Sequence, residues 1–491
     1  MINIIKKYKN MPVQLRAGFW FLVCSVLQRG ITIITTPLFT RFLTPAEYGE
    51  YSLFISWQGI IYCIVTLNLF YGTYMQAIVK FEEKKDEISS SVQGLTFTMT
   101  IFYVLVYFAF KNRIDILMST NTLRMMSMFI IVWSNAAFSF WSANKRVEYK
   151  YKLLVAVMLA QTILQPMLCI LLLKKLNNKV DGVILGIAVV SLVVYFIPFI
   201  SQMIRGKVFY DRRTWTYFLK LGLPLIPHYL ASIVLSNFDR IMIEKMVGKS
   251  QVGFYNLAYT ISMVGLILNS AVLQTLQPWL YKQMKQKQYH RMEDVAFPSL
   301  LIIAFFNVLV LIFAPEILRI FAPSSFDEAK WVMPPIVASV FFMFMYNLFA
   351  DFEFYYEKTH YTSITTVICA IANILLNYIF IPIFGYIAAG YTTLVCYMMF
   401  SAGHYFLMQK INKDILGGIK IYNMKKIVLL SLTFISFCIL IMITYTNVYV
   451  HYLTILILFA FIVIFRKKIY NYVLNVKRKF TLENKGNEEN E

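Results

Sequence analysis

The sequence predicts an all-α, polytopic membrane protein with about fourteen transmembrane helices. Of its 491 residues, 59% are hydrophobic and only 14% are charged, whereas a typical soluble domain carries about 25% charged residues. Apolar stretches long enough to cross a bilayer, which takes ~20 residues, recur along the chain. They are expected to be helical because lipid leaves backbone N–H and C=O groups without water to bond. This pattern excludes an ordinary soluble enzyme and a disordered scaffold.

The predicted spans are apolar on every face, which excludes a transmembrane barrel built of alternating segments of about ten residues. In chain order they cover roughly 16–39, 50–72, 91–110, 121–142, 152–173, 182–204, 217–240, 251–274, 296–314, 332–351, 361–381, 384–407, 425–444 and 449–466. The outward connections are short, and none could hold the external domain that a sugar polymerase needs.

Basic residues between the spans indicate their orientation. Both termini and the connections on one side hold 33 of the 46 Lys and Arg residues, and the opposite connections hold 10. The positive-inside rule therefore places both termini in the cytoplasm. The net charge of +21 is an orientation signal and not a phosphate-binding stripe, so no nucleic acid partner is expected.

The two halves of the chain match each other at an offset of 204 residues. Gly49 falls on Gly253, Tyr51 on Tyr255 and Gly186 on Gly390. Equal spacing of the spans favours a duplicated six-span unit over chance matches, and the copies would be parallel repeats. The predicted domains are a cytoplasmic N-terminal segment (1–15), an N-lobe (16–204), a cytoplasmic linker (205–216), a C-lobe (217–407), a linker with two further spans (408–466) and a disordered cytoplasmic tail (467–491).

Polar residues four apart lie along one flank of the seventh span, where they share a helix face. The row is His228, Ser232, Ser236 and Arg240, and the positions 204 residues before its last three members are Gln28, Thr32 and Thr36. Such rows can line a polar cavity, or their hydroxyls can bond to another helix or back to their own backbone. Both interpretations stay open.

Charged residues inside the spans indicate the charge of the molecule that the protein is expected to transport. Arg29 lies near the middle of the first span, where a charge costs about 2.5–3.5 kcal/mol, and it is the leading site residue. Asp239 and Arg240 end the seventh span and serve equally well as a structural ion pair or as substrate contacts. Apart from Glu50 at the start of the second span, the first six spans hold no Asp or Glu. An anionic, phosphate-bearing cargo therefore fits better than a cation.

Other polar residues are given structural roles. Arg124 is interpreted as an interfacial anchor, and Asp351 and Glu353 are expected to pair with cytoplasmic lysines. The five histidines are scattered singly, and the six cysteines lie in apolar segments without CxxC spacing. No catalytic residue, metal site or cofactor is therefore predicted.

Several motifs resemble bacterial polysaccharide transporters, the oligosaccharide flippases of the Wzx type in O-antigen, capsule and exopolysaccharide pathways. The first half carries Pro37-Leu-Phe-Thr-Arg-Phe-Leu-Thr-Pro-Ala-Glu-Tyr-Gly-Glu-Tyr-Ser-Leu53. The second half carries Leu221-Gly-Leu-Pro-Leu-Ile-Pro227, Asn237-Phe-Asp-Arg-Ile-Met-Ile243, Val252-Gly-Phe-Tyr-Asn-Leu-Ala-Tyr259 and Gly385-Tyr-Ile-Ala-Ala-Gly390. The similarity covers about 16–466.

The resemblance implies two six-helix lobes in a V around a central cavity, plus two C-terminal helices, as in the multidrug/oligosaccharidyl-lipid/polysaccharide (MOP) exporters. It implies a flippase, not an enzyme, that moves undecaprenyl-diphosphate-linked oligosaccharide units across the bacterial cytoplasmic membrane by alternating access. Charged cavity residues would be Arg29, Asp239 and Arg240. Membrane lipids, a polysaccharide polymerase and a chain-length regulator are the implied partners, and a proton or sodium gradient is one possible energy source. A lipid II flippase or a cation-coupled multidrug exporter remains the alternative.

Overall fold

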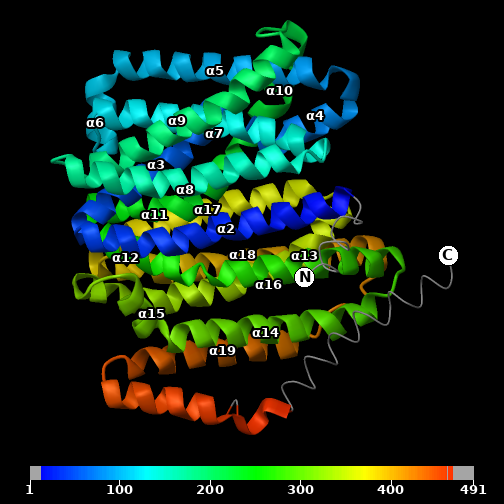
Figure 1. Cartoon of the computed structure of the whole chain (residues 1–491). Coiled ribbons are helices and arrows are strands. Elements are labelled where there is room, and N and C mark those ends of the chain that lie inside the picture. The colour runs from blue at the N-terminus through cyan, green and yellow to red at the C-terminus, as the bar shows by residue number, and fades with distance from the viewer. Residues whose placement is uncertain (1–12, 462, 468–491) are drawn as a thin grey trace, which may run out of the picture. The chain divides into compact units, whose positions relative to one another are not determined.

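The computed structural model describes residues 13–461 and 463–467, and these residues form helices and connections without a β-strand (Figure 1). Contacts divide the chain into two units, with the boundary after Glu244. The predicted all-α architecture is confirmed. The unit boundary lies beyond the sequence-derived linker 205–216, and the predicted lobe limits stay a prediction.

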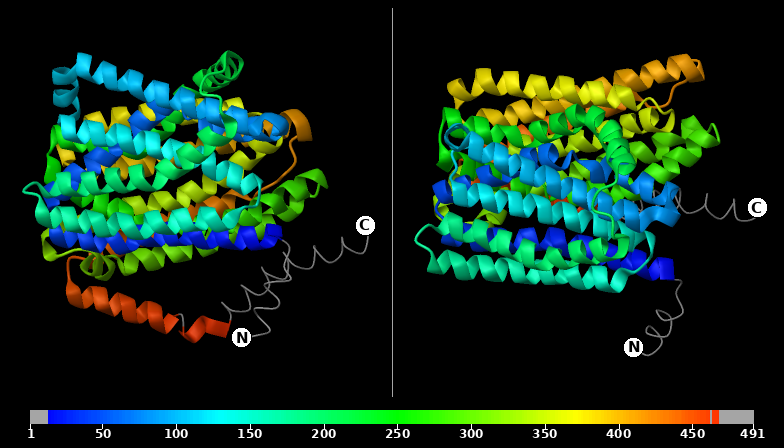
Figure 2. Two further views of the ribbon diagram at one scale, coloured as in Figure 1. Left: turned by 45° about the horizontal axis from the view of Figure 1, so that its top comes forward. Right: turned by 90° about the horizontal axis from the view of Figure 1, so that it is seen from above.

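Unit 1 is a bundle of long helices joined by short turns. Its elements are α2 (Val13–Phe42), α3 (Pro45–Thr66), the π-helix η1 (Phe70–Tyr74), α4 (Met75–Lys80), η2 (Glu82–Lys84), α5 (Lys85–Ala109), α6 (Lys111–Met118), α7 (Thr122–Val147), α8 (Tyr151–Lys175), α9 (Lys179–Gly206), α10 (Arg212–Gly222), η3 (Leu223–Leu225) and α11 (Ile226–Met246). α9 packs against both α7 and α8, and the three run alongside one another in Figure 2.

Helix α3 begins at the Thr-Pro-Ala-Glu motif, whose chemistry explains the start. The Thr44 hydroxyl accepts a hydrogen bond from the Glu47 amide, and the Glu47 carboxylate accepts one from the Thr44 amide at 2.8 Å. Pro45 occupies the first helical position, where a missing N–H costs nothing. The motif therefore works as a capping box that fixes where the second span begins.

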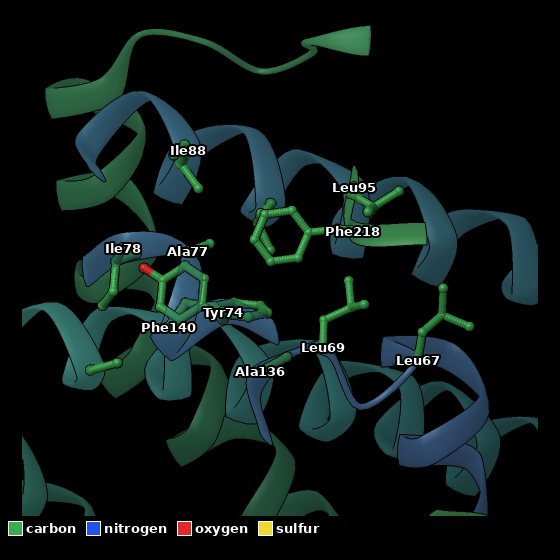
Figure 3. Packing of buried hydrophobic residues seen from close by; sticks show 12 residues of the cluster. Leu67, Leu69, Tyr74, Ala77, Ile78, Ile88, Leu95, Ala136, Phe140 and Phe218 are labelled. Carbon is green, nitrogen blue, oxygen red and sulfur yellow. The ribbon is translucent and has the colours of Figure 1, made fainter. Parts of the chain in front are cut away.

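A buried hydrophobic cluster joins α10 to the rest of unit 1. Phe218 of α10 is 1% exposed, and Figure 3 shows it between Ile88 and Leu95 of α5 and the segment that carries Leu69 and Tyr74. The Tyr74 ring also meets Phe140 of α7 at a centroid distance of 4.7 Å. The second half of the predicted linker is thus a packed helix.

Unit 2 contains the remaining helices. They are α12 (Lys249–Ser262), α13 (Gly265–Lys285), η4 (Tyr289–Arg291), α14 (Met292–Ile312), α15 (Ala314–Phe321), η5 (Ser324–Trp331), α16 (Met333–Tyr355), α17 (Thr359–Phe384), α18 (Ile387–Leu416) and α19 (Met424–Thr444), followed by a helix over Val448–Lys467. α18 packs against both α16 and α17. These pairs are the counterparts of α7–α9 and α8–α9 at an offset of 204, so the packing agrees with the predicted repeat.

Eleven helical segments among the described residues are long and apolar enough to span a membrane. The spans predicted at 16–39, 50–72 and 384–407 coincide with α2, α3 and α18, which are long helices outside that set. The chain is a multi-pass membrane protein, and a total of fourteen spans stays a prediction.

Several predicted spans are interrupted. In the second, α3 ends at Thr66, and Leu67 and Asn68 have positive φ before η1 begins. The seventh changes from α10 to α11 through Leu223-Pro224-Leu225, because Pro224 and Pro227 lack the amide hydrogens of a regular helix. The eighth changes from α12 to α13 at Met263 and Val264. Hydropathy shows each as one apolar run because it does not detect such breaks.

Candidate functional site

A polar cavity of about 340 Å³ lies inside unit 1, within the size range of small-molecule sites. Five helices contribute to it: α2, α3, α7, α8 and α9. Its walls are formed by Thr35, Phe39, Tyr51, Ile55, Gln58, Ile131, Asn135, Gln161, Thr162, Gln165, Pro166, Ile187, Ser191 and Tyr195. None of these lining residues is Asp, Glu, Lys, Arg or His, so the wall is polar yet uncharged.

Gln161 organises the polar wall of the cavity. Its side-chain amide nitrogen donates to the Gln165 carbonyl at 2.8 Å and lies 3.3 Å from the Ser191 hydroxyl on α9. Among the described residues, its own side-chain oxygen is buried without a hydrogen-bond partner, and so is that of Gln58. An unpaired buried acceptor is destabilising, so these two oxygens are positioned to receive donors from a ligand.

Pro166 adds a backbone acceptor at the same wall. Proline has no amide hydrogen, so inside α8 it leaves the carbonyl of Thr162, one turn earlier, without its helical donor. Thr162 and Pro166 both line the cavity. The α8 wall therefore presents acceptors from Gln161, Gln165 and the backbone.

Aromatic rings complete the lining. Phe39 and Tyr51 meet edge to face at a centroid distance of 5.7 Å, and Tyr195 stacks on Phe138 at 4.4 Å. These contacts hold the ring orientations at two sides of the cavity. Amides, hydroxyls and aromatic rings together suit an uncharged, hydroxyl-rich ligand better than an ion.

Of the residues predicted for the site on the first span, the structure describes the side chain of only one, Thr36. Gln28, Arg29 and Thr32 belong to α2, and their side chains lie outside the described residues. Thr36 is buried at 5% exposure and is not part of the cavity wall. The cavity role of Gln28, Arg29 and Thr32 stays a prediction.

The predicted row of the seventh span lies on α11. The Ser236 hydroxyl donates to the Ser232 carbonyl at 2.9 Å, and the Ser232 hydroxyl donates to the His228 carbonyl at 3.1 Å. These contacts agree with the interpretation in which the hydroxyls of the row bond back to their own helix backbone. His228 is half-buried, and its buried Nδ1 makes no hydrogen bond with any described residue.

Asp239 and Arg240 are both buried at the end of that row, at 0% and 3% exposure. The Arg240 guanidinium donates to the Ser236 carbonyl on its own helix. Neither residue lines the cavity of unit 1. Their substrate role stays a prediction.

Arg124 belongs to an ionic clasp and is not an interfacial anchor. Its guanidinium lies 2.6 Å from Asp181 and 3.5 Å from Glu50, and its side chain is only 8% exposed. The clasp joins α7, α9 and α3 at one end of unit 1. The anchor interpretation was wrong because residues 57 and 74 positions away supply the counter-charges.

Glu148 forms a second clasp in the turn between α7 and α8. Lys150, Lys85, Lys145 and Arg205 lie 2.9, 3.2, 3.7 and 3.8 Å from its carboxylate. Burial raises the pKa of Glu148, but the lysines outweigh burial and lower the pKa to about 2. While it is ionised, the carboxylate therefore holds α5, α7, α9 and the turn before α8 together.

Among the described residues, the carboxylates of α16 form no salt bridge with a lysine. Asp351 accepts a hydrogen bond from the Gln277 amide at 2.6 Å. The Glu353 carboxylate lies 2.6 Å from Nδ1 of His404 and accepts a hydrogen bond from Thr362 at 2.7 Å. The predicted lysine partners were wrong, and His404 is not an isolated histidine.

Sequence reasoning missed the cavity in unit 1, although part of its signal was present. Gln161 and Gln165 are spaced to share a helix face, and a proline follows directly within an apolar span. Gln58, Asn135 and Ser191 are polar residues on three other spans. Only packing shows that they meet.

Comparison with known proteins defines the class. Residues 15–284, more than half of the chain, match the family model described as polysaccharide biosynthesis protein, and residues 224–379 match the MatE model. A protein of the Lsg locus of Haemophilus influenzae is 24% identical over 202 residues, which cover 40% of this chain and 50% of that protein. The chain thus aligns with about half the length of that relative.

Solved transporters share the fold. The lipid II flippase MurJ in an inward closed conformation is 17% identical, with a TM-score of 0.68 over 92% of this chain and 99% of that chain. An inward-facing MATE family multidrug resistance transporter of the MOP superfamily is 14% identical, with a TM-score of 0.62 over 79% and 96%. The fold is therefore shared with the lipid II flippase MurJ and with a MATE family transporter of the MOP superfamily.

The chain belongs to the polysaccharide biosynthesis protein family.

Proposed function

We propose that the protein flips undecaprenyl-diphosphate-linked oligosaccharide units from the cytoplasmic to the outer leaflet of the bacterial cytoplasmic membrane. The observation that carries this proposal is the uncharged polar cavity of unit 1 in a chain of the polysaccharide biosynthesis family. Sugar hydroxyls cannot cross ~30 Å of hydrocarbon without hydrogen-bond partners. A wall with unpaired glutamine acceptors supplies such partners.

In this proposal, different residues would bind the sugar part and the diphosphate part of the lipid headgroup. The unpaired oxygens of Gln161 and Gln58 would accept from sugar hydroxyls, with Tyr51 and Tyr195 beside the ring faces. Arg29 would hold the diphosphate, since a guanidinium recognises phosphate through paired hydrogen bonds. The polymerase and the chain-length regulator would take the product at the outer face. Coupling to a proton or sodium gradient belongs to the same proposal.

The absence of carboxylates in this cavity disfavours a cationic drug as cargo. A positive ligand would leave its charge without a partner among the described lining residues. Lipid II shares the polyprenyl diphosphate and sugar chemistry, so it is the alternative that the experiment must separate.

The test uses a deletion strain complemented with variants. Deletion should strand lipid-linked repeat units at the cytoplasmic leaflet and remove surface glycan, while peptidoglycan synthesis continues. Gln161→Leu keeps the side-chain size, removes the acceptor and should lower export at least fivefold. Arg29→Ala should abolish export, and Arg29→Lys should restore part of it.

Gln283→Leu is the matched control, because Gln283 is also a buried glutamine and lies on α13, in unit 2. At equal membrane abundance it should export normally. Normal surface glycan in the deletion strain would refute the proposal. Arrested peptidoglycan synthesis in that strain would instead identify lipid II as the substrate. Wild-type export by Gln161→Leu would remove the cavity from the site.

A further inference from the structure

A fully buried carboxylate–imidazole pair in unit 2 is left unused by the proposed transport site. Glu353 near the end of α16 and His404 on α18 both have side chains that are 0% exposed. Their Oε1 and Nδ1 atoms lie 2.6 Å apart. Ionisable groups in membrane-spanning helices are rare because they are costly there, and they usually mark ion or proton pathways.

The pair ties three helices together at one point. The Thr362 hydroxyl on α17 donates to Oε2 of Glu353 at 2.7 Å, so both carboxylate oxygens are bonded. The imidazole stacks on Tyr346 of α16 at a centroid distance of 5.5 Å and meets Phe400 edge to face at 4.5 Å. A separation of α16, α17 and α18 would break these contacts together.

One atom of the pair has no partner. Nε2 of His404 is buried and makes no hydrogen bond within the described part of the chain. The imidazole exchanges its second proton at this atom, and it can do so without disturbing the Nδ1–Oε1 contact. The atom that would exchange the proton, Nε2, is thus a different atom from Nδ1, which holds the contact with Glu353.

Neighbouring charges do not neutralise the pair. Asp351, two residues before Glu353, is bonded to Gln277 and Tyr281 of α13 instead. Lys410 of α18 lies 5.2 Å from the ring centre of Tyr361. Among the described residues, no Lys or Arg forms a salt bridge with Glu353.

Both charge states of the pair are therefore penalised while it is closed. An imidazolium beside the carboxylate has no net charge, but its Nε2–H lacks an acceptor. A neutral imidazole beside the carboxylate leaves one buried negative charge that is hydrogen-bonded but has no cation beside it among the described residues. Access of water to Nε2 changes the balance between these states, which links proton occupancy to the opening of the three helices.

We propose that Glu353 and His404 form a proton-binding site that takes up one proton from water at Nε2 and releases it to water when α16, α17 and α18 rearrange. The proton would be the coupling ion of the proposed transport cycle, and in that sense the inference rests on the proposed function. Nothing is oxidised or reduced, because only an N–H bond forms and breaks.

The experiment measures proton binding without any glycan. Full-length protein is reconstituted in phosphatidylethanolamine–phosphatidylglycerol vesicles on a solid-supported membrane and given pH jumps. The wild type should show a transient charge displacement that titrates with pH. His404→Gln and Glu353→Gln should reduce the displaced charge at least twofold, whereas His360→Gln, an exposed histidine on α17, should retain it.

Thr362→Val keeps the test decisive if both pair variants fail to fold. It removes only a hydrogen-bond donor to the Glu353 carboxylate and leaves both members of the pair in place, so the displaced charge should differ from that of the wild type. A wild type without a transient, pair variants with unchanged charge, or a Thr362→Val variant that displaces charge as the wild type does would each overturn the proton site. Normal surface glycan in the deletion strain together with a wild-type transient would refute the flippase and leave the site intact.

Discussion

At the residue scale, Arg124 shows how an arginine becomes tolerable inside an apolar bundle. Its guanidinium faces two carboxylates, Asp181 and Glu50, and all three groups are largely buried. Each charge is costly to desolvate, and removing one partner exposes that cost. The presence of these ion pairs is therefore weak evidence for stability, whereas the loss of one partner should be strongly destabilising.

Arg124→Met should lower the free energy of unfolding by about 3 kcal/mol, because it removes the buried cation that lies beside the carboxylates of Asp181 and Glu50. The measurement is equilibrium unfolding of the purified protein in mixed micelles by added denaturing detergent. Lys111→Met is the control, since Lys111 forms an exposed pair with Asp115 on α6 and its loss should cost much less stability than the loss of Arg124. Equal losses in the two variants would contradict the clasp.

Glu148 makes the stability of unit 1 depend on acid. Its pKa is lowered from 4.5 to about 2 in the folded protein, so the folded state stabilises the ionised form. This contribution is complete above about pH 4.5 and is lost as the pH falls toward 2. It amounts to at most about 3 kcal/mol.

Unfolding measured between pH 7 and pH 3 should show this loss in the wild type and a shallower dependence in Glu148→Gln. Glu148→Gln should also be the less stable protein at pH 7, with the two converging at low pH. Parallel pH profiles would mean that another carboxylate governs the acid response.

At the element scale, the approach of α8 and α9 sets the geometry of the cavity. A Cβ at Gly186 would lie 2.8–2.9 Å from backbone atoms of Cys169, and one at Gly182 would lie 2.8 Å from backbone atoms of Leu172. Backbone atoms cannot move aside as a flexible side chain does. The two glycines therefore fix how close Gln161 on α8 comes to Ser191 on α9.

Gly186→Ala should push α8 and α9 apart, lower the stability of the protein and reduce export together. Thermal unfolding in detergent and surface glycan in the complemented deletion strain measure the two effects. Gly18→Ala, also inside a helix, is the control, because a Cβ there meets nothing within 4 Å. It should be neutral or slightly stabilising, since alanine favours helix more than glycine does. Identical behaviour of the two variants would rule out the close approach as the cause.

At the scale of the whole molecule, the even number of predicted spans and the excess of basic residues on one side predict how the protein is oriented in the membrane. The turn between α8 and α9 should face outward, and the turn after α13 should face the cytoplasm. Asn177 and Gln286 are exposed residues in these two turns. All six native cysteines are buried and free, so a cysteine-free background is a reasonable starting point.

Asn177→Cys should react with a membrane-impermeant maleimide in intact cells from which any outer barrier has been removed. Gln286→Cys should react only after the membrane is permeabilised. The readout is gel-shift labelling of each single-cysteine protein. The reverse pattern would invert the proposed topology and with it the direction of transport.

The sequence predicted most of the fold but little of the cavity in unit 1. Spans such as 152–173 and 182–204 coincide with α8 and α9, because hydropathy and helix length are local properties. Gln161, Ser191 and Gln58 lie on three different helices, and no local pattern indicates that they share a cavity. Glu353 and His404 are 51 residues apart and were assigned other partners or none for the same reason.

The sequence alone determined that this protein is a multi-pass helical membrane protein with two similar halves, because apolar runs, basic connections and the 204-residue offset can be read without knowing any contact. Only the tertiary structure decided where unpaired acceptors, ionic clasps and the buried Glu353–His404 pair lie. Such sites depend on which helix faces come together, and in an apolar bundle each helix has several faces of similar hydrophobicity. The choice among them is made by packing between distant residues.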